Sequence, residues 1–318
     1  MKPPQLSSRL RSVVAEELPL PGAGATPLRH QRLMEIGRED LTLARLAEAH
    51  WDAVAILAEA GRRPAPNQLY GVWASEKPGE ILELRWSASG PAVTGPKMFC
   101  SGAGLVDRAL VTVGIPNNLL VEVDLRRNAA NIRFDYSGWK TRAFEETYTS
   151  KAIFEDAAVT EAAVIGDPGW YINRPGFWHG ACGPAACWAG GAIGLVDFAM
   201  CQNRNDAHTL AHLGAMHTAR WGLRSHLDQA GREIDADPTN VDEAEIRALS
   251  LRHLIEQLCT DVLRRIPRAF GPFPLTMDEA ISLRYQELDL YLRQSHAERD
   301  LEGLATRLRQ LKPSNPDL

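Results

Sequence analysis

The sequence predicts an α+β protein with several domains: N-terminal helices, a central antiparallel β-barrel or β-sandwich, and a C-terminal helical bundle. Three changes of pattern predict this order. Apolar residues recur at helical spacing up to about residue 65, short β-type runs follow, and the helical period returns after Gly166-Asp167-Pro168. The predicted boundaries are 1–65 for a short helical region, 66–165 for the β-domain, 166–312 for the helical domain and 313–318 for a tail.

The N-terminal region is predicted to form short amphipathic helices. Apolar positions between Leu41 and Leu57 recur among charges, and Gly61 and Pro64 end the pattern. The β-domain is predicted from closely spaced apolar runs that are bounded by turn residues. These runs are Leu69–Trp73, Ile81–Trp86, Lys97–Cys100, Ala109–Val113, Leu119–Val123, Ile132–Phe134 and Ala152–Phe154.

The C-terminal region begins with a stretch of small residues. Gly180–Val196 has no charge, but its many Gly, Ala and Cys residues and its proline favour a buried helix over a membrane span. Pro175 suits the start of that helix, with Asn173 as a possible cap. We therefore expect a helix that lets another backbone or a flat ligand approach closely.

The last helices are predicted from a change in the phase of their apolar stripe. Thr276 and Glu279 form a capping-box pattern, which predicts the start of a helix whose stripe ends at Leu292. The stripe reappears from Leu301 on nearly the opposite side of a continuous helix wheel. The sequence therefore predicts a break or a change of buried face between Leu292 and Leu301, and a break would expose polar groups to a cavity.

Composition and net charge indicate which kinds of partner and location to expect for the protein. The chain has 318 residues, 24% of them charged, and a formal charge of −5, so nucleic acid is not an expected partner. Five cysteines are an odd number in a chain of this length, which favours reduced thiols buried as small apolar residues. The first residues lack the pattern of a secretory signal, so a cytoplasmic location is expected.

The segment Gly95–Gly102 resembles a strand of the acyl-CoA dehydrogenase family, of the form G-x-K-x-(Trp/Phe)-x-(Thr/Ser). In that family FAD lies across a β-domain and helical domains. The resemblance thus implies FAD as cofactor, with Phe99 against the flavin ring and Ser101 as a hydroxyl donor near N5 or O4 of the flavin. Tyr70–Gly79 is similar to the family's strand that ends in Thr-Glu-Pro, which implies Ser75 beside the flavin pyrimidine. Without the resemblance, Phe99 would be a core residue and Ser101 a turn residue.

Two further segments extend the resemblance. Arg174–Ala185 is similar to the family's long helix that opens with Arg-Pro, which implies that Arg174 and Trp178 line a substrate channel. Arg268-Ala269-Phe270-Gly271 falls where the family has a Gln-x-x-Gly-Gly turn, which implies that Arg268 and Gly271 contact FAD. The alternatives are a core role for the aromatic residue and loop punctuation at the glycine.

His296 falls where the family has its catalytic Glu, between the last two helices. The resemblance implies that His296 is the base that takes the substrate α-proton, and an imidazole with a pKa of about 6.5 suits that task at neutral pH. A charged turn that includes His296 and Glu298 is the alternative. His208 and His212 lie four apart on a predicted helix, but no further ligand of the kind that zinc needs is placed with them, so no metal site is predicted.

The resemblance implies an FAD-dependent oxidoreductase that removes hydrogen from the α and β carbons of an acyl thioester, bound to CoA or a carrier. Its electrons would pass to an electron-transfer flavoprotein. A flavin monooxygenase of the same superfamily is the first alternative, and it fits His296 better. A non-catalytic assembly or binding subunit is the second, because the family's Gly-Ser-Asp element and catalytic Glu are missing. The apolar helix stripes predict a homo-oligomer.

Overall fold

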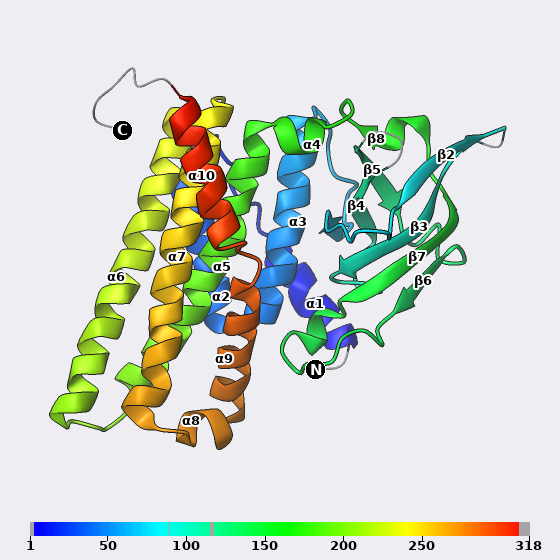
Figure 1. Cartoon of the computed structure of the whole chain (residues 1–318). Coiled ribbons are helices and arrows are strands. Elements are labelled where there is room, and N and C mark those ends of the chain that lie inside the picture. The colour runs from blue at the N-terminus through cyan, green and yellow to red at the C-terminus, as the bar shows by residue number, and fades with distance from the viewer. Residues whose placement is uncertain (1–2, 89, 115–117, 312–318) are drawn as a thin grey trace. The chain divides into compact units, whose positions relative to one another are not determined.

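The computed structural model describes residues 3–88, 90–114 and 118–311, and Figure 1 shows the order of its elements along the chain. The predicted tail, 313–318, lies outside the described residues. The chain forms two compact units, each assembled from segments that are distant in sequence. The first unit, called the β-unit here, combines Met1–Leu18 with Thr42–Phe177, and the second, the helical unit, combines Pro19–Leu41 with Trp178–Leu318. The N-terminal helices are therefore shared between the units.

The β-unit contains two four-stranded sheets, with strand orders β1-β4-β5-β8 and β2-β3-β7-β6. No strand pairing joins the two sheets within the described residues, so of the two predicted arrangements, a barrel or a sandwich, the barrel is not closed. The pair β1 and β4 is parallel, and all other pairs are antiparallel as predicted. The strands are β1 (Tyr70–Trp73), β2 (Glu83–Ser87), β3 (Gly90–Cys100), β4 (Arg108–Val113), β5 (Leu119–Asp124), β6 (Ile132–Asp135), β7 (Ser150–Ala158) and β8 (Val164–Ile165).

Aromatic side chains fill the space between the two sheets. The indole of Trp73, from β1, lies edge-on to Phe134 of β6 and to Phe154 of β7, with ring centroids 6.2 and 6.4 Å apart. Trp73 and Phe154 are fully buried. Such contacts hold the sheets together without a closed ladder of hydrogen bonds. Helices α1 (Pro3–Val14), α3 (Leu41–Glu59) and α4 (Trp170–Asn173) and the short 3₁₀ turns η1 (Glu145–Thr147) and η2 (Glu161–Ala163) complete this unit.

The helical unit is a bundle in which α6 and α7 pack side by side, with α10 against α7 (Figure 1). Its helices are α2 (Thr26–Glu39), α5 (Pro175–Met200), α6 (Ala207–Ala236), α7 (Val241–Phe270), α8 (Phe273–Thr276), α9 (Glu279–Leu292) and α10 (Glu298–Gln310). Side chains cap three of the helix starts: Asp206, Asn240 and Asp278 each accept a backbone N–H three residues further on.

Small residues allow α2 and α5 to cross closely. A Cβ added at Gly37 of α2 would lie 2.6 Å from the Cys187 carbonyl oxygen, and one added at Gly190 of α5 would overlap the backbone of α2. Helix α5 is long and apolar enough to cross a membrane by length and composition, and 72% of its most apolar window is buried inside the protein. That burial is what the central helix of a bundle shows, as the sequence predicted for Gly180–Val196.

The helix ends confirm one prediction and correct three others. Helix α9 ends at Leu292 and α10 begins at Glu298, so the predicted break is present. Asp278 caps α9, whereas Thr276 is the last residue of α8 and donates its hydroxyl to the Pro272 carbonyl. The short α8 turn, which the sequence pattern did not reveal, accounts for that error. Asn173 belongs to α4 and does not cap α5, and Cys201 is exposed while the other cysteines are buried.

Candidate functional site

Phe99 lies in the β-unit at an irregular point of strand β3. The register between β3 and β7 shifts between Lys97 and Cys100, and Phe99 has a left-handed φ of 55°. A bulky residue in that conformation is strained, and such strain clusters at functional sites. The bulge leaves the Phe99 ring 55% exposed, so the ring is available to a ligand and is not a core residue.

Ser101, two residues further on, begins a chain of hydroxyl hydrogen bonds. Its Oγ lies 2.9 Å from Thr149 Oγ1, which lies 2.8 Å from Thr147 Oγ1, and Thr147 Oγ1 donates to the Phe144 carbonyl at 2.7 Å. A hydroxyl has one hydrogen to donate. Because Thr147 gives its hydrogen to the carbonyl, Thr149 must donate to Thr147, and Ser101 must donate to Thr149. The Ser101 oxygen is therefore left as a hydrogen-bond acceptor, and not as the donor to the flavin that the resemblance implies.

The strand end that leads to Ser75 lies next to this chain. The Trp73 indole nitrogen on β1 donates to the Ser101 carbonyl at 3.0 Å, and the Gly102 N–H donates to the Thr147 carbonyl at 2.8 Å. Ser75 follows β1 by two residues and is half-buried. The structure thus places Ser101 beside the strand that leads to Ser75, while the roles of Ser75, Phe99 and Ser101 at a flavin stay predictions.

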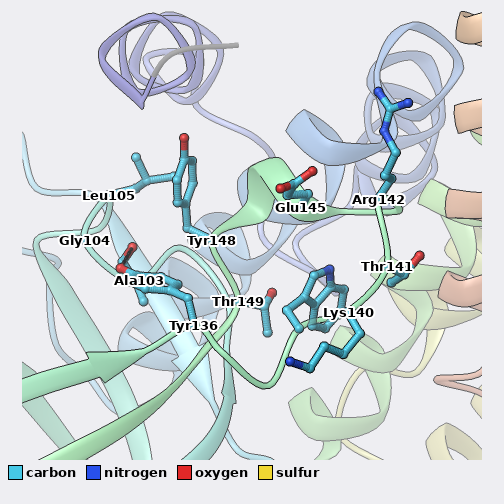
Figure 2. Close-up of a pocket in the computed structure, with 11 residues that line it drawn as sticks. Ala103, Gly104, Leu105, Tyr136, Lys140, Thr141, Arg142, Glu145, Tyr148 and Thr149 are labelled. Atoms are coloured by element: carbon cyan, nitrogen blue, oxygen red, sulfur yellow. Dashed lines mark hydrogen bonds between the residues drawn. The ribbon is translucent and has the colours of Figure 1, made fainter.

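A cavity of about 530 Å³ adjoins this region, and Thr149 is part of its wall. Two segments of the chain line it, the loop after β3 and the loop between β6 and β7, as Figure 2 shows. Its walls carry aromatic, hydroxyl and charged groups: Ala103, Gly104, Leu105, Tyr136, Trp139, Lys140, Thr141, Arg142, Glu145, Tyr148 and Thr149. We call it the β-unit cavity.

Hydrogen bonds and ring contacts hold the aromatic walls in place. The Tyr136 hydroxyl donates to the Ala103 carbonyl at 3.1 Å, and the Trp139 indole nitrogen donates to the Ala143 carbonyl at 3.0 Å. The rings of Tyr136 and Tyr148 meet edge to face with centroids 6.4 Å apart. Burial, followed by the effect of Tyr148, raises the pKa of Tyr136, so its phenol stays protonated at neutral pH.

Two aromatic residues of the loop between β6 and β7 have strained backbones. Phe144 has a φ of 56° and Tyr148 a φ of 49°, both in the left-handed region that bulky residues avoid. Phe144 is fully buried beneath the guanidinium of Arg45, whose Cζ lies 4.8 Å from the ring centroid. Of these two residues and Phe99, Tyr148 lines the cavity, the Phe144 carbonyl accepts the hydrogen bond at the end of the hydroxyl chain, and Phe99 lies two residues before Ser101. Strained backbone of this kind clusters at functional sites.

The β-unit cavity can hold a flat aromatic ligand that carries an anionic group. Aromatic rings from Tyr136, Trp139 and Tyr148 offer stacking or edge contacts, and the positive charges of Lys140 and Arg142 outnumber the one negative charge of Glu145. Its volume lies in the range of small-molecule and cofactor sites. These features suit a flavin, which combines a planar ring with a phosphate, so the residues present fit that group.

Arg174 and Trp178, the predicted channel residues, lie on either side of the boundary between the units. Arg174 belongs to the β-unit, where it is buried, paired with Glu59, and stacked over Trp170 and Tyr171 at 5.2 and 5.3 Å. This ion pair gives Arg174 a structural task at the start of α5. Trp178 is half-buried in the first turn of α5 and belongs to the helical unit. A channel role for either residue stays a prediction.

The other predicted site residues belong to the helical unit. Arg268 is exposed near the end of α7, where its carbonyl oxygen lies 3.1 Å from His208 Nε2, and Gly271, with a φ of 69°, ends that helix. His296 lies in the turn between α9 and α10, where its side chain is 66% exposed and its Nδ1 is 3.2 Å from Asp300. His296 lines neither of the two cavities that the structure describes in this chain. Their roles stay predictions.

The sequence analysis missed the loop between β6 and β7, which supplies most of the cavity wall. Residues 136–149 connect two paired strands by far more residues than a hairpin needs, and long loops are often functional. The loop also concentrates aromatic and basic residues, namely Tyr136, Trp139, Lys140, Arg142 and Tyr148. That composition was the available signal.

No protein-family profile and no curated protein matches the sequence. Solved structures match the fold. The complex of TdsC from Paenibacillus sp. with FMN and indole has a TM-score of 0.76 at 15% identity, over 98% of this chain and 96% of that chain. Methanesulfinate monooxygenase MsuC from Pseudomonas fluorescens has a TM-score of 0.74 at 16% identity, over 99% of both chains. A nitrososynthase from Micromonospora carbonacea var. africana has a TM-score of 0.78 at 15% identity, over 96% and 93%.

These likenesses show that the chain has the fold shared by flavin-dependent enzymes of the acyl-CoA dehydrogenase type. The order of helices, strands and helices that the sequence predicted is confirmed. TdsC, which another solved structure describes as a dibenzothiophene monooxygenase, and MsuC are both named monooxygenases, and none of the three is named an acyl-CoA dehydrogenase.

Proposed function

We propose that the protein is a flavin-dependent monooxygenase, which uses a reduced flavin and dioxygen to oxidise a small organic substrate. The fold it shares with named monooxygenases and the chemistry of the β-unit cavity support this proposal. When bound, the reduced flavin would supply the electrons that activate dioxygen. This function replaces the dehydrogenation of an acyl thioester as the first candidate.

The residues of the β-unit would bind and orient the flavin. Phe99 would pack against the ring, and Lys140 and Arg142 would pair with the phosphate. Tyr136, Trp139 and Tyr148 would form walls that exclude water, and water exclusion strengthens every hydrogen bond inside the site. Ser75, predicted beside the pyrimidine, follows the strand whose Trp73 holds the Ser101 carbonyl.

The direction of hydrogen-bond donation along the hydroxyl chain is the observation that supports the proposal most. Since Ser101 donates its hydrogen to Thr149, it offers only an oxygen lone pair to a ligand. The ring nitrogen N5 of a flavin bears a hydrogen in the reduced form and is an acceptor in the oxidised form. An accepting Ser101 therefore complements the reduced flavin, and a monooxygenase of this kind has to bind that form before dioxygen reacts.

The identity of the flavin follows from the same comparison. FAD was the sequence-based expectation, whereas the TdsC complex with a similar fold contains FMN. We propose FMN as the first cofactor to test, with FAD as the second. FAD stays in the test because the resemblance implies that Arg268 and Gly271 contact it.

A homo-oligomer remains part of the proposal. Helix α6 exposes Trp221 by 69% and Leu210 by 49%, and α7 exposes Leu254 by 42%. Large apolar side chains exposed on neighbouring helices are typical of protein interfaces. Light scattering on the purified protein measures the mass directly, and a single 35.1 kDa species that binds flavin tightly would contradict this part.

The test begins with purified protein incubated with FMN or FAD and then desalted. We expect a yellow protein with the two absorption bands of oxidised flavin, and chromatography of the released flavin identifies it. Replacing both cations, Lys140→Gln with Arg142→Gln, should weaken FMN binding by about 10²–10⁴-fold, because each charged contact contributes about 1.5–3 kcal/mol. Riboflavin, which lacks the phosphate, should bind the variant and the wild type alike.

Arg85→Gln is the matched control, because Arg85 is an exposed cation of the β-unit that pairs with Glu83 on β2. It should bind FMN as the wild type does. Anaerobic addition of octanoyl-CoA to the yellow protein separates the two enzymatic candidates, since only a dehydrogenase would bleach the flavin. A colourless protein that ignores both flavins would leave the non-catalytic subunit as the remaining candidate.

A further inference from the structure

A second cavity, of about 390 Å³, lies within the helical unit, between α2 and α6 with one wall from α5. Apolar and polar groups share its lining, and the apolar side chains include Leu28 and Met34 of α2, Ile193 of α5 and Leu227 of α6. Met34, Ile193 and Leu227 are buried from bulk solvent, while Leu28 is 55% exposed at the opening. We call it the α2–α6 cavity, and it shares no residue with the β-unit cavity.

Close helix crossings at both ends fix the shape of the α2–α6 cavity. A Cβ added at Gly231 of α6 would lie 2.7 Å from the Pro27 nitrogen, so the first turn of α2 rests on α6. Near its other end, α2 rests on α5, where a Cβ at Gly37 would lie 2.6 Å from the Cys187 carbonyl. Since the helices cannot approach further or slide without backbone overlap, the space between them is preformed, which lowers the cost of binding a ligand.

One buried polar group lies in the wall of the cavity. His30 is 2% exposed, and its Nδ1 lies 2.9 Å from the Leu227 carbonyl oxygen. A carbonyl only accepts, so Nδ1 carries the proton and Nε2 is the acceptor of a neutral ring. Burial lowers the pKa of His30 to about 4, which keeps the ring neutral at physiological pH. Among the described residues Nε2 has no hydrogen-bond partner, so a ligand with an O–H or N–H could supply one.

Among the charged side chains at the opening, one arginine has no ion pair within the described residues. Glu35 lies 3.6 Å from Arg32 and accepts a hydrogen bond from Gln31 at 2.8 Å. Asp228 pairs with Arg232 at 2.8 Å, and Arg38 pairs with Asp197. Arg224 is exposed at the same opening, and within the described part of the chain it makes no ion pair or hydrogen bond. The opening therefore favours a ligand with a single negative charge.

We propose that the α2–α6 cavity binds a small aromatic or aliphatic monocarboxylate. Its apolar body would fill the space between Met34, Ile193 and Leu227, its carboxylate would pair with Arg224, and a donor group on the body would reach His30. Each part of this ligand matches a part of the wall: the apolar side chains, one guanidinium without an ion pair among the described residues, and one accepting imidazole nitrogen. The inference concerns a site separate from the flavin site and holds whether or not the protein binds a flavin.

Isothermal titration calorimetry with 2-naphthoate tests the proposal on the full chain. We expect one molecule bound per chain, and Arg224→Gln should weaken binding by about tenfold, the effect of one lost charged hydrogen bond. Gln31→Trp, a change at an exposed position on the rim, should block the opening and abolish binding. The neutral 2-naphthalenemethanol should bind the wild type and Arg224→Gln equally. The control is Arg299→Gln, an exposed cation on α10, which should bind 2-naphthoate as the wild type does.

Two results would overturn the proposal. One is a wild-type protein that takes up no 2-naphthoate. The other is binding that Arg224→Gln and Gln31→Trp leave unchanged, since the ligand would then sit elsewhere, for example in the β-unit cavity. Circular dichroism of each variant shows whether it is folded, and because both changed residues are exposed, we expect native spectra. Light scattering of Gln31→Trp adds a second reading: a change of mass without 2-naphthoate binding would mean that another copy of the chain covers the opening.

Discussion

Thr149→Val removes the central link of the hydroxyl chain and keeps the shape of the side chain. Thr149 is 4% exposed, and its hydroxyl takes part in hydrogen bonds of 2.9 and 2.8 Å with Ser101 and Thr147. Each such bond contributes about 0.5–1.5 kcal/mol, so the variant should lose roughly 1–3 kcal/mol of stability. Thermal unfolding followed by circular dichroism measures this loss, and a lower midpoint is expected.

The same substitution should alter the relative affinity of the protein for oxidised and reduced flavin. Without Thr149 as acceptor, the Ser101 hydroxyl can turn and donate to a ligand, so its match to the oxidised flavin improves. We expect the ratio of Kd values, oxidised over reduced FMN, to fall by about tenfold, the effect of one hydrogen bond of about 1.4 kcal/mol.

Anaerobic fluorescence titration of both FMN forms gives that ratio. Thr149→Ser, which keeps the hydroxyl, is the matched control and should keep the wild-type ratio. A wild-type ratio in Thr149→Val would refute the reasoning about the direction of the chain.

Three further predictions concern stability and the base. Burial lowers the pKa values of His30 and His50 to about 4, so both stay neutral in the folded chain while the unfolded chain takes up protons below about pH 6.5. The free energy of unfolding should therefore be highest above pH 6.5 and fall as the pH drops toward 4, by up to about 3 kcal/mol for each residue. Thermal unfolding midpoints from pH 7.5 to 4.5 measure this fall, and midpoints that do not change with pH would contradict it. Gly190→Ala should lower the free energy of unfolding by about 1–3 kcal/mol, because its Cβ would overlap the backbone of α2. Gly214→Ala on α6 has open space around it and should raise the free energy of unfolding by up to about 1 kcal/mol. Equal unfolding midpoints of the two variants would disprove this contrast. His296→Ala should fold and bind flavin normally, since His296 is exposed. If His296 is the base, turnover by the variant should drop by about 10²–10⁴-fold. Unchanged steady-state turnover would show that His296 is not the base.

Some β-strands could be predicted well because turn residues bound their apolar runs, whereas β3 begins seven residues before its predicted run and β8 was not predicted. Observed strands such as β4, Arg108–Val113, and β6, Ile132–Asp135, match the predicted runs to within about two residues. Whether the two sheets close into a barrel could not be predicted from such local patterns. Pairing between distant segments, such as the parallel register of Tyr70 with Arg108, leaves no local signal in the sequence.

The assembly of the helices shows a similar limit. The sequence placed all N-terminal helices in one region, whereas α2 packs with α6 and belongs to the helical unit. The contacts responsible join Pro27 to Gly231 and Gly37 to Cys187, far apart along the chain. The break after Leu292 was predictable because a change of buried face leaves a clear change of phase in the sequence.

The candidate site was predicted in part. Phe99 and Ser101 were identified from a motif resemblance, and the structure adds the physical reasons, a strained backbone at Phe99 and a hydroxyl chain that starts at Ser101. Thr147 and Thr149 could not be found from the sequence, because their importance comes from hydrogen bonds across the loop. His296 illustrates the opposite case, in which the motif position predicts a role that its exposed side chain does not explain.

The most direct test of the central claim is an anaerobic titration of the wild-type protein with reduced FMN and, separately, with oxidised FMN. The account predicts that the protein binds one flavin per chain and binds the reduced form more tightly, because Ser101 presents an acceptor to the site. Tighter binding of oxidised FMN, or no binding of either form, would contradict it.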